Sequence, residues 1–286
     1  MWYPGHIEKA KKQIGKQLKI VDTVIELLDA RIPYTSRAYE YEYLFQNKPV
    51  IFILNKEDLA DPQITRKWLN YFRKKGQLVL VTNLKKVNAK DFLMRRVFPL
   101  VKSKFAEKRI MIVGIPNVGK STFINRLRGK RSLTVGNIPG VTRGVQWITA
   151  GENLMVLDTP GIIYTRLHSP TIITKLLAVG ALPAEKMDTI EAAKNVFNLL
   201  IERYSHAPLE DRLKKSFEDP IDFLEKFTER RGLLKSHGEL DVEKGAFIFL
   251  REVADGKFGR FSYETPEEVE ILLKNKEKKQ NDSKGV

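Results

Sequence analysis

Short, uninterrupted hydrophobic runs recur through the first half of the chain, and amphipathic segments separate them. Runs of this kind are typical of strands buried on both faces of a parallel sheet. They predict strands at 21–28, 49–54, 77–81, 109–113, 145–150 and 153–157. Apolar residues at helical spacing predict helices at 7–19, 39–46, 62–75, 89–105 and 121–128. Alternating strands and helices indicate a doubly wound, mostly parallel α/β sheet.

The pattern changes after about residue 165, where helical spacing continues and buried-strand runs cease. It predicts helices at 170–182, 187–204, 208–217, 220–230, 241–254 and 266–277. We therefore expect an α/β domain over residues 1–175 and a small all-helical domain over 176–286. The last residues are polar and charged, so we expect the chain to fray from about residue 277.

The segment Gly114–Ser121 lies between a predicted strand and a predicted helix and reads G-x-x-x-x-G-K-S. This pattern in this context is typical of a phosphate-binding loop, whose glycines let backbone N–H groups face a phosphate at a helix N-terminus. Lys120 supplies a positive charge for the β- and γ-phosphates, and Ser121 offers a hydroxyl to Mg²⁺. The expected nucleotide contacts here are Asn117, Val118, Gly119, Lys120, Ser121 and Thr122.

A second motif, Asn55-Lys56-Glu57-Asp58, follows the strand at 49–54. The Asp58 carboxylate can accept hydrogen bonds from N1–H and the 2-amino group of guanine, whereas adenine would leave it unpaired. Asn55 can contact the base and tie this loop to the phosphate loop, and the methylenes of Lys56 can lie over the purine. The competing interpretation is a polar turn in which Asp58 caps a helix.

Three further segments complete the expected nucleotide site. Asp158-Thr159-Pro160-Gly161 follows the strand at 153–157, which places a carboxylate near Mg²⁺, through water, and the N–H of Gly161 near a γ-phosphate. Thr142, in the loop 139–144, is the candidate whose hydroxyl closes on Mg²⁺. Thr82 and Asn83 end another strand and are expected beside the guanine.

The amino-acid composition indicates a negatively charged partner. The 286 residues include 50 Lys and Arg against 35 Asp and Glu, for a net charge of +15. Such an excess favours a polyanion such as nucleic acid, although a basic surface is also common in proteins from hot environments. The absence of cysteine suits a reducing cytoplasm. The N-terminus has no apolar signal region, and no stretch approaches the length of a membrane helix, so no membrane partner is expected.

The order of the motifs is reversed from that of ordinary GTPases, because the guanine motif precedes the phosphate loop. With Trp2–His6, Asp29–Pro33, Pro139–Arg143 and Gly256–Arg260, nearly the whole chain resembles the YlqF/RbgA family of circularly permuted ribosome-assembly GTPases. One departure is Ser36-Arg37-Ala38-Tyr39, where Ser-Arg-Asn-Pro is more usual.

The resemblance implies a GTPase that hydrolyses GTP to GDP and phosphate and acts late in assembly of the large ribosomal subunit. Nucleotide state would gate binding to the pre-ribosome and its rRNA, and the enzyme would be slow alone and stimulated by the subunit. We expect a monomer.

The residue that orients the attacking water does not follow from the motifs. Ile162 stands where many GTPases carry a glutamine, and it has no polar atom to place a water. The resemblance implies that His6 serves instead, although from the residues alone His6 reads as a turn residue. The expected catalytic groups are His6, Lys120, Thr142 and Gly161. The resemblance also implies that Asn117 helps to bind K⁺ near the phosphates.

Two basic segments are candidates for RNA contact. Lys9 and Lys12 lie on the predicted first helix, while Lys257 and Arg260 flank Phe258, near Phe261. Charge beside an aromatic ring suits RNA, but both phenylalanines can instead belong to the core. Two rivals to the GTPase stay open: an RNA-binding scaffold that uses GTP as a structural ligand, and an ATPase or nucleotide kinase, against which Asn55–Asp58 argues.

Overall fold

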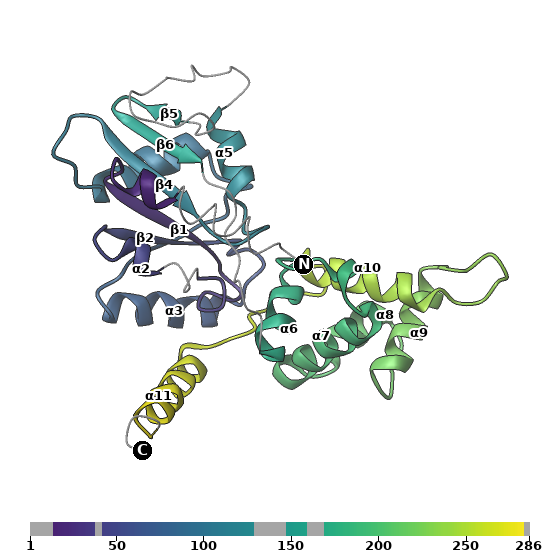
Figure 1. Cartoon of the computed structure of the whole chain (residues 1–286). Coiled ribbons are helices and arrows are strands. Elements are labelled where there is room, and N and C mark those ends of the chain that lie inside the picture. Colours follow the sequence, from purple (N-terminus) through teal and green to yellow (C-terminus); the bar gives the residue numbers. More distant parts are fainter. Residues whose placement is uncertain (1–13, 38–41, 129–146, 159–168, 283–286) are drawn as a thin grey trace.

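The computed structural model describes residues 14–37, 42–128, 147–158 and 169–282, with only the backbone for Asp158, Lys186 and 276–282. Its centre is a six-stranded sheet in the order β3-β2-β1-β4-β6-β5, in which only β5 runs antiparallel (Figure 1). The strands are β1 (Thr23–Asp29), β2 (Val50–Asn55), β3 (Leu78–Val81), β4 (Lys108–Val113), β5 (Trp147–Gly151) and β6 (Leu154–Asp158). The predicted parallel α/β sheet is confirmed.

The chain starts this sheet in its middle. From β1 it moves outward through β2 to β3, then returns to place β4 on the other side of β1. The strand order therefore reverses between β1 and β4, and ligands of open α/β sheets bind in the crevice at the carboxyl ends of such strands. The loops that follow β1, β2, β3 and β4 all begin at this end of the sheet.

The helices of the first half are α2 (Glu42–Phe45), α3 (Pro62–Lys74), α4 (Ala89–Phe92) and α5 (Lys120–Arg128). Those of the second half are α6 (Pro170–Ala178), α7 (Thr189–Tyr204), α8 (Ala207–Leu213), α9 (Pro220–Arg230), α10 (Val242–Ala254) and α11 (Pro266–Asp282). Local sequence sets several starts. The Asp61 carboxylate, for example, accepts from two N–H groups of the first turn of α3, and Pro62 follows it.

The predicted helix at 89–105 is wrong in its second half. After α4 the chain continues as a π-helical turn, η2 (Leu93–Val97), and a 3₁₀ turn, η3 (Phe98–Leu100), and residues 101–107 are irregular. Pro99 lies in η3 and has no N–H to continue an α-helical ladder, which accounts for the tightening and the end there. Residues 102–105 of the loop that follows line a second cavity of the molecule.

Three other helix ends differ from the prediction by four residues or more. Helix α6 ends at Ala178 rather than 182, because Gly180 takes a left-handed conformation (φ 72°) that stops the helix. Helix α8 ends at Leu213 rather than 217, before Lys214 at φ 58°. Helix α11 continues to Asp282, five residues beyond the predicted end at 277.

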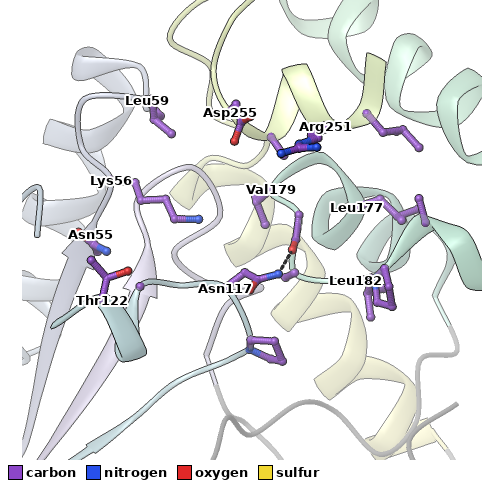
Figure 2. Close-up of a pocket in the computed structure, with 18 of the residues that line it drawn as sticks. Asn55, Lys56, Leu59, Asn117, Thr122, Leu177, Val179, Leu182, Arg251 and Asp255 are labelled. Carbon is purple, nitrogen blue, oxygen red and sulfur yellow. Dashed lines mark hydrogen bonds between the residues drawn. The ribbon is translucent and has the colours of Figure 1, made fainter. Parts of the chain in front are cut away.

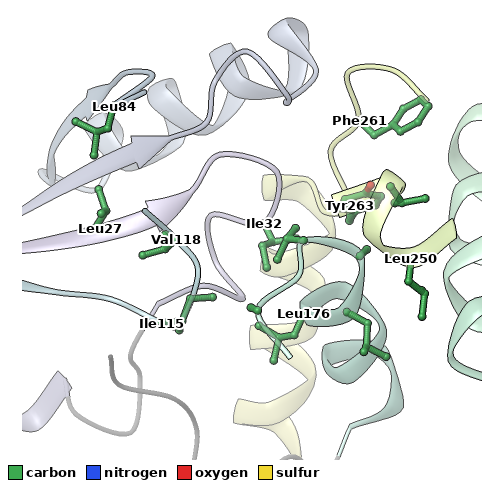
Figure 3. Packing of buried hydrophobic residues seen from close by; sticks show 14 of the residues in the cluster. Leu27, Ile32, Leu84, Ile115, Val118, Leu176, Leu250, Phe261 and Tyr263 are labelled. Carbon is green, nitrogen blue, oxygen red and sulfur yellow. The ribbon is translucent and has the colours of Figure 1, made fainter. Parts of the chain in front are cut away.

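The core continues from the sheet into the helical part. Leu27 and Val118 beside the sheet belong to the same buried cluster as Leu176 of α6 and Leu250 of α10, with Ile32 between them (Figure 3). Helices α6 to α10 lie together at the carboxyl ends of the strands (Figure 1). The two parts of the chain are therefore joined by buried apolar contacts as well as by their connecting segments.

Helix α11 lies apart from the other C-terminal helices and packs against α3, where buried Val269 joins the cluster of Trp68 (Figure 1). The segment that leads to it, residues 256–265, we call the strap. The strap crosses the loop after β2, and the Phe261 N–H donates to the Leu59 carbonyl at 2.9 Å. The C-terminal residues thus return to the first half of the chain.

Candidate functional site

The phosphate loop follows β4, and its backbone has the conformation that the motif requires. Asn117 and Gly119 both have positive φ, 58° and 107°. A Cβ at Gly114 would lie 2.7 Å from the Leu27 carbonyl oxygen, so this position accepts only glycine without a backbone shift. Lys120 is the first residue of α5 and is nine-tenths buried, and Ser121 follows on an exposed face. The turn therefore presents backbone N–H groups at a helix N-terminus, as a phosphate requires.

Asn55 ties the phosphate loop to the guanine motif. Its Nδ2 donates to the Val118 carbonyl at 2.7 Å, and its Oδ1 accepts from the Leu84 N–H at 2.9 Å. The side chain is buried, and a Cβ on Gly119 would lie 2.3 Å from Nδ2. The predicted link between the two loops is present, and it extends to the loop after β3.

The Lys56 ammonium is held by Asp29 at the end of β1, at 3.0 Å. The Asp29 carboxylate also accepts from the Arg31 guanidinium, at 2.9 Å from both Nε and Nη2. Burial alone would raise the pKa of Asp29, but the charges of Arg31 and Lys56 outweigh it and hold that pKa well below its usual range. Burial lowers the pKa of Lys56. This network fixes the stem of Lys56 across the site.

Asp58 lies further along the same loop and is partly exposed. Its carboxylate is 3.8 Å from Lys86, a lysine on the surface, so this pair holds it only weakly. Thr82 and Asn83 are buried beside it, and the Glu57 N–H faces the Thr82 carbonyl at 3.4 Å. The Asn83 Nδ2 is buried and has no acceptor among the described residues. The region thus holds a carboxylate acceptor and a buried donor near each other.

These loops open onto one cavity of about 930 Å³ (Figure 2). Asn55, Lys56 and Asp58 line one side, and Asn117, Gly119 and Thr122 continue the wall along the phosphate loop. The opposite wall comes from the helical part and includes Val179, Leu182, Arg251 and Asp255 (Figure 2). The volume lies in the range of small-molecule and cofactor sites.

Five hydrogen bonds from three side chains connect the loops around the site to the C-terminal half. The Asn117 Nδ2 donates to the Gly180 carbonyl at 2.7 Å (Figure 2). Arg31 donates to the carbonyls of Val179 at 3.3 Å and Ala254 at 2.7 Å. Arg260 in the strap donates to the carbonyls of Glu57 at 2.8 Å and Ala60 at 3.0 Å.

Sequence reasoning did not assign roles to Arg31, Gly180 or the strap in this site. Arg31 had a visible sign, a charged pair directly after a buried strand, at Asp29-Ala30-Arg31. Phe258 and Phe261 belong to the core, at 7% and 6% exposure. Arg260 makes the intramolecular bonds above, and the Lys257 ammonium lies 3.3 Å from Glu252.

Several predicted residues lie outside the described parts of the chain: His6, Lys9, Lys12, Thr142, Gly161 and the side chain of Asp158. Ser121 remains among the described residues, and its hydroxyl is an oxygen donor of the kind that Mg²⁺ accepts. Among the described residues no group of three His, Asp or Glu side chains is placed to bind a metal unaided. The donor set therefore fits a Mg²⁺ held mainly by a hydroxyl and nucleotide phosphates.

No described helix is long and apolar enough to cross a membrane. The fold and the site together define the class of protein: a GTP-binding P-loop protein in which the guanine motif precedes the phosphate loop. A family model described as 50S ribosome-binding GTPase matches residues 109–224.

Relatives with known names match almost end to end. Ribosome biogenesis GTPase A of Thermotoga maritima is 41% identical over 268 residues, which cover 94% of this chain and 95% of that protein. The protein of the same name from Priestia megaterium is 38% identical, covering 95% and 99%. The solved structure of GNP-bound YlqF from T. maritima matches with a TM-score of 0.72 at 37% identity, covering 91% of this chain and 99% of that one. The chain belongs to the ribosome biogenesis GTPase A (YlqF/RbgA) family and is a GTPase.

Proposed function

We propose that this GTPase hydrolyses GTP to GDP and phosphate and acts as a late assembly factor of the large ribosomal subunit. One observation carries the nucleotide part of the proposal. The guanine-reading loop and the phosphate loop are joined by the Asn55–Val118 bond across 63 residues and open onto the same cavity. The relatives named above, and the net charge of +15, support a partner rich in RNA.

The base is read by Asp58, whose carboxylate accepts from N1–H and the 2-amino group of guanine. The fixed stem of Lys56 covers the purine face, and the buried Asn83 amide is a donor for an acceptor atom of the base. Lys120 and the N–H groups of the phosphate loop bind and orient the phosphates. Ser121 would hold Mg²⁺, with Asp158 acting through water and Thr142 closing from its loop, and the ion would neutralise charge on the β- and γ-phosphates.

The attacking water needs a group that the loop after β6 does not supply, because Ile162 has no polar atom. We assign this role to His6, which would approach when the protein binds its particle. Imidazole can accept or hold a proton near neutral pH. The Oδ1 of Asn117 remains for a K⁺ ion, since the contact to Gly180 uses only the amide nitrogen of that side chain.

Nucleotide state would gate particle binding through the contacts between the two halves. Asn117 of the phosphate loop bonds to Gly180, directly after α6, so a change in this loop on phosphate binding acts on that turn. Gly161 would add a second route, because the segment after β6 leads into α6 at Pro170. For this gating to work, the nucleotide must bind more tightly when the helices hold one pose than when they hold the other.

GTP turnover, with and without purified large ribosomal subunits, tests the proposal. We expect stimulation by the subunits, loss of that stimulation in His6→Ala, and faster turnover in KCl than in NaCl. Wild-type stimulated turnover in His6→Ala would remove His6 from the mechanism. Tight GTP binding without turnover under any condition would favour the scaffold that uses GTP as a structural ligand.

A further inference from the structure

A second cavity, of about 580 Å³, lies at the opposite end of the sheet from the nucleotide site. It is formed by the segments that lead into β1, β2 and β4, so it adjoins the amino ends of three neighbouring strands. Strands of this length separate the two sites by about 20 Å. None of the described residues that line the nucleotide cavity also lines this one.

The walls of this cavity are strongly basic. The described residues that line it include five cations, namely Lys19, Lys48, Lys102, Lys104 and Arg109, and one carboxylate, that of Asp22. Asp22 is already engaged, because its Oδ2 accepts from the Arg109 N–H at 2.8 Å. The cavity therefore has a net positive field available to an anion.

Two of these cations have partners within the chain. The Lys48 ammonium donates to the Val21 carbonyl at 2.7 Å, and the Arg109 Nε lies 3.0 Å from Glu107. In contrast, Lys19, Lys102 and Lys104 are exposed and have no ion-pair or hydrogen-bond partner among the residues that the structure describes. Their charges face solvent at the rim of the cavity.

Phe105 stands among these lysines and is 77% exposed, more than any other exposed large hydrophobic residue that the structure describes. Its loop is nevertheless anchored at both ends. Before Phe105, Val101 is buried. After it, the Lys108 ammonium donates to the Phe98 carbonyl and lies 3.9 Å from the centre of the Phe98 ring. The Phe105 N–H also donates to the Ser103 hydroxyl at 3.1 Å, which makes a local turn.

We propose that this cavity binds single-stranded RNA, with Phe105 stacking on a base and Lys19, Lys102 and Lys104 contacting the adjoining phosphates. Proteins that bind single-stranded nucleic acid combine an exposed aromatic ring with nearby cations. The ring stacks on a base, and the cations contact the negatively charged phosphates that join the nucleotides. The inference rests on the proposed function in so far as the partner is a ribosomal particle, and it names a face of the protein for that RNA.

The test is fluorescence anisotropy of a labelled 12-nucleotide oligouridylate at several salt concentrations, with the full-length protein. Lys102→Glu/Lys104→Glu is expected to weaken binding about tenfold or more and to flatten the salt dependence by about 1.4 in log–log slope, the value for two phosphates of a single strand. Phe105→Ala is expected to weaken binding about fivefold or more, and Phe105→Trp to retain it.

The matched control is Lys74→Glu/Lys90→Glu, which makes the same charge change at exposed lysines of α3 and α4 and is expected to bind within about twofold of wild type. Unchanged GTP turnover without subunits shows that each variant is folded. Polyglutamate serves as an acidic polypeptide for comparison.

RNA binding by Phe105→Ala at the wild-type level, or equal losses in the two lysine pairs, would overturn the proposal. So would a wild-type protein that does not bind the oligonucleotide, or losses that are the same for polyglutamate and RNA. If the variants bind RNA normally while subunits still stimulate GTP turnover, only this inference fails. Absence of stimulation in the wild type instead contradicts the proposed function.

Discussion

Replacing Glu264 tests how the strap is attached to both halves of the chain. Glu264 is fully buried, and its Oε1 accepts from the N–H groups of Tyr34 at 2.5 Å and Thr35 at 2.9 Å. Its Oε2 accepts from the Thr35 hydroxyl at 2.5 Å and from Lys175 of α6 at 3.2 Å. One carboxylate thus joins the loop after β1, helix α6 and the strap.

Glu264→Ala removes the acceptor for all four donors and leaves the Lys175 ammonium, 7% exposed, without its counter-charge. Breaking a buried pair in this way costs about 3–5 kcal/mol. For a chain of this size that lowers the melting temperature by roughly 6–20 °C. The measurement is urea and thermal unfolding followed by circular dichroism.

A double-mutant cycle separates the charge from the hydrogen bonds. Glu264→Gln keeps a carbonyl acceptor but leaves the buried Lys175 ammonium without a counter-charge. The double variant Glu264→Gln/Lys175→Met removes that ammonium as well. The double variant should therefore be less destabilised than the sum of the singles, by about 1–3 kcal/mol. The control Glu267→Gln alters an exposed pair with Lys67 and should cost less than about 1 kcal/mol. A Glu264→Ala protein as stable as this control, or a cycle that sums additively, would refute the reasoning.

Three further predictions concern the nucleotide loops. Asp58→Asn should weaken GTP binding by roughly 100-fold and erase the preference for GTP over ATP, because a carboxylate that accepts from two guanine donors is lost. Isothermal titration with both nucleotides measures this, and an unchanged preference would reopen the ATPase interpretation. Asp29→Asn should destabilise the protein at pH 7, and its deficit relative to wild type should shrink as the pH falls below about 4. The sign follows from the lowered pKa of Asp29. Below the ordinary value of 3.8 the unfolded carboxylate takes up a proton that the folded one still rejects, so the stability that Asp29 contributes falls with pH. A deficit that is constant in denaturation curves from pH 7 to pH 2.5 would contradict this. Gly119→Ala should abolish GTP binding and cost about 1–3 kcal/mol, because its φ is 107° and a Cβ would lie 2.3 Å from the Asn55 Nδ2. Gly15→Ala, which meets nothing within 4 Å, is its control and should bind GTP normally when both variants are measured by isothermal titration.

The sheet could be predicted from sequence because its strands are buried on both faces and appear as continuous apolar runs. The phosphate and guanine loops could be predicted because each depends on a few residues at fixed spacing directly after a strand. In both cases the determining interactions are local, so a short stretch of sequence contains them.

What could not be predicted depends on contacts between distant segments. The helix at 89–105 has the right periodicity for a single helix, yet the chain leaves the α-helical pattern after Phe92, and Pro99 has no N–H with which to resume it. Nothing near Glu264 in the sequence indicates that Lys175 and Thr35 will surround it. Arg260 looks like a surface charge until the loop carrying Glu57 is placed beside it.

The order in which the chain is made has a consequence for the guanine site. The bond from Arg260 to the Glu57 carbonyl spans 203 residues, so the strap leaves the ribosome long after the loop that it supports. The β1-β2-β3 unit, with the guanine-reading loop, is synthesised long before the segment that supports this loop. A site braced by the strap reaches its final form only after the strap has been made, so tight guanine binding is expected only once synthesis has passed residue 265.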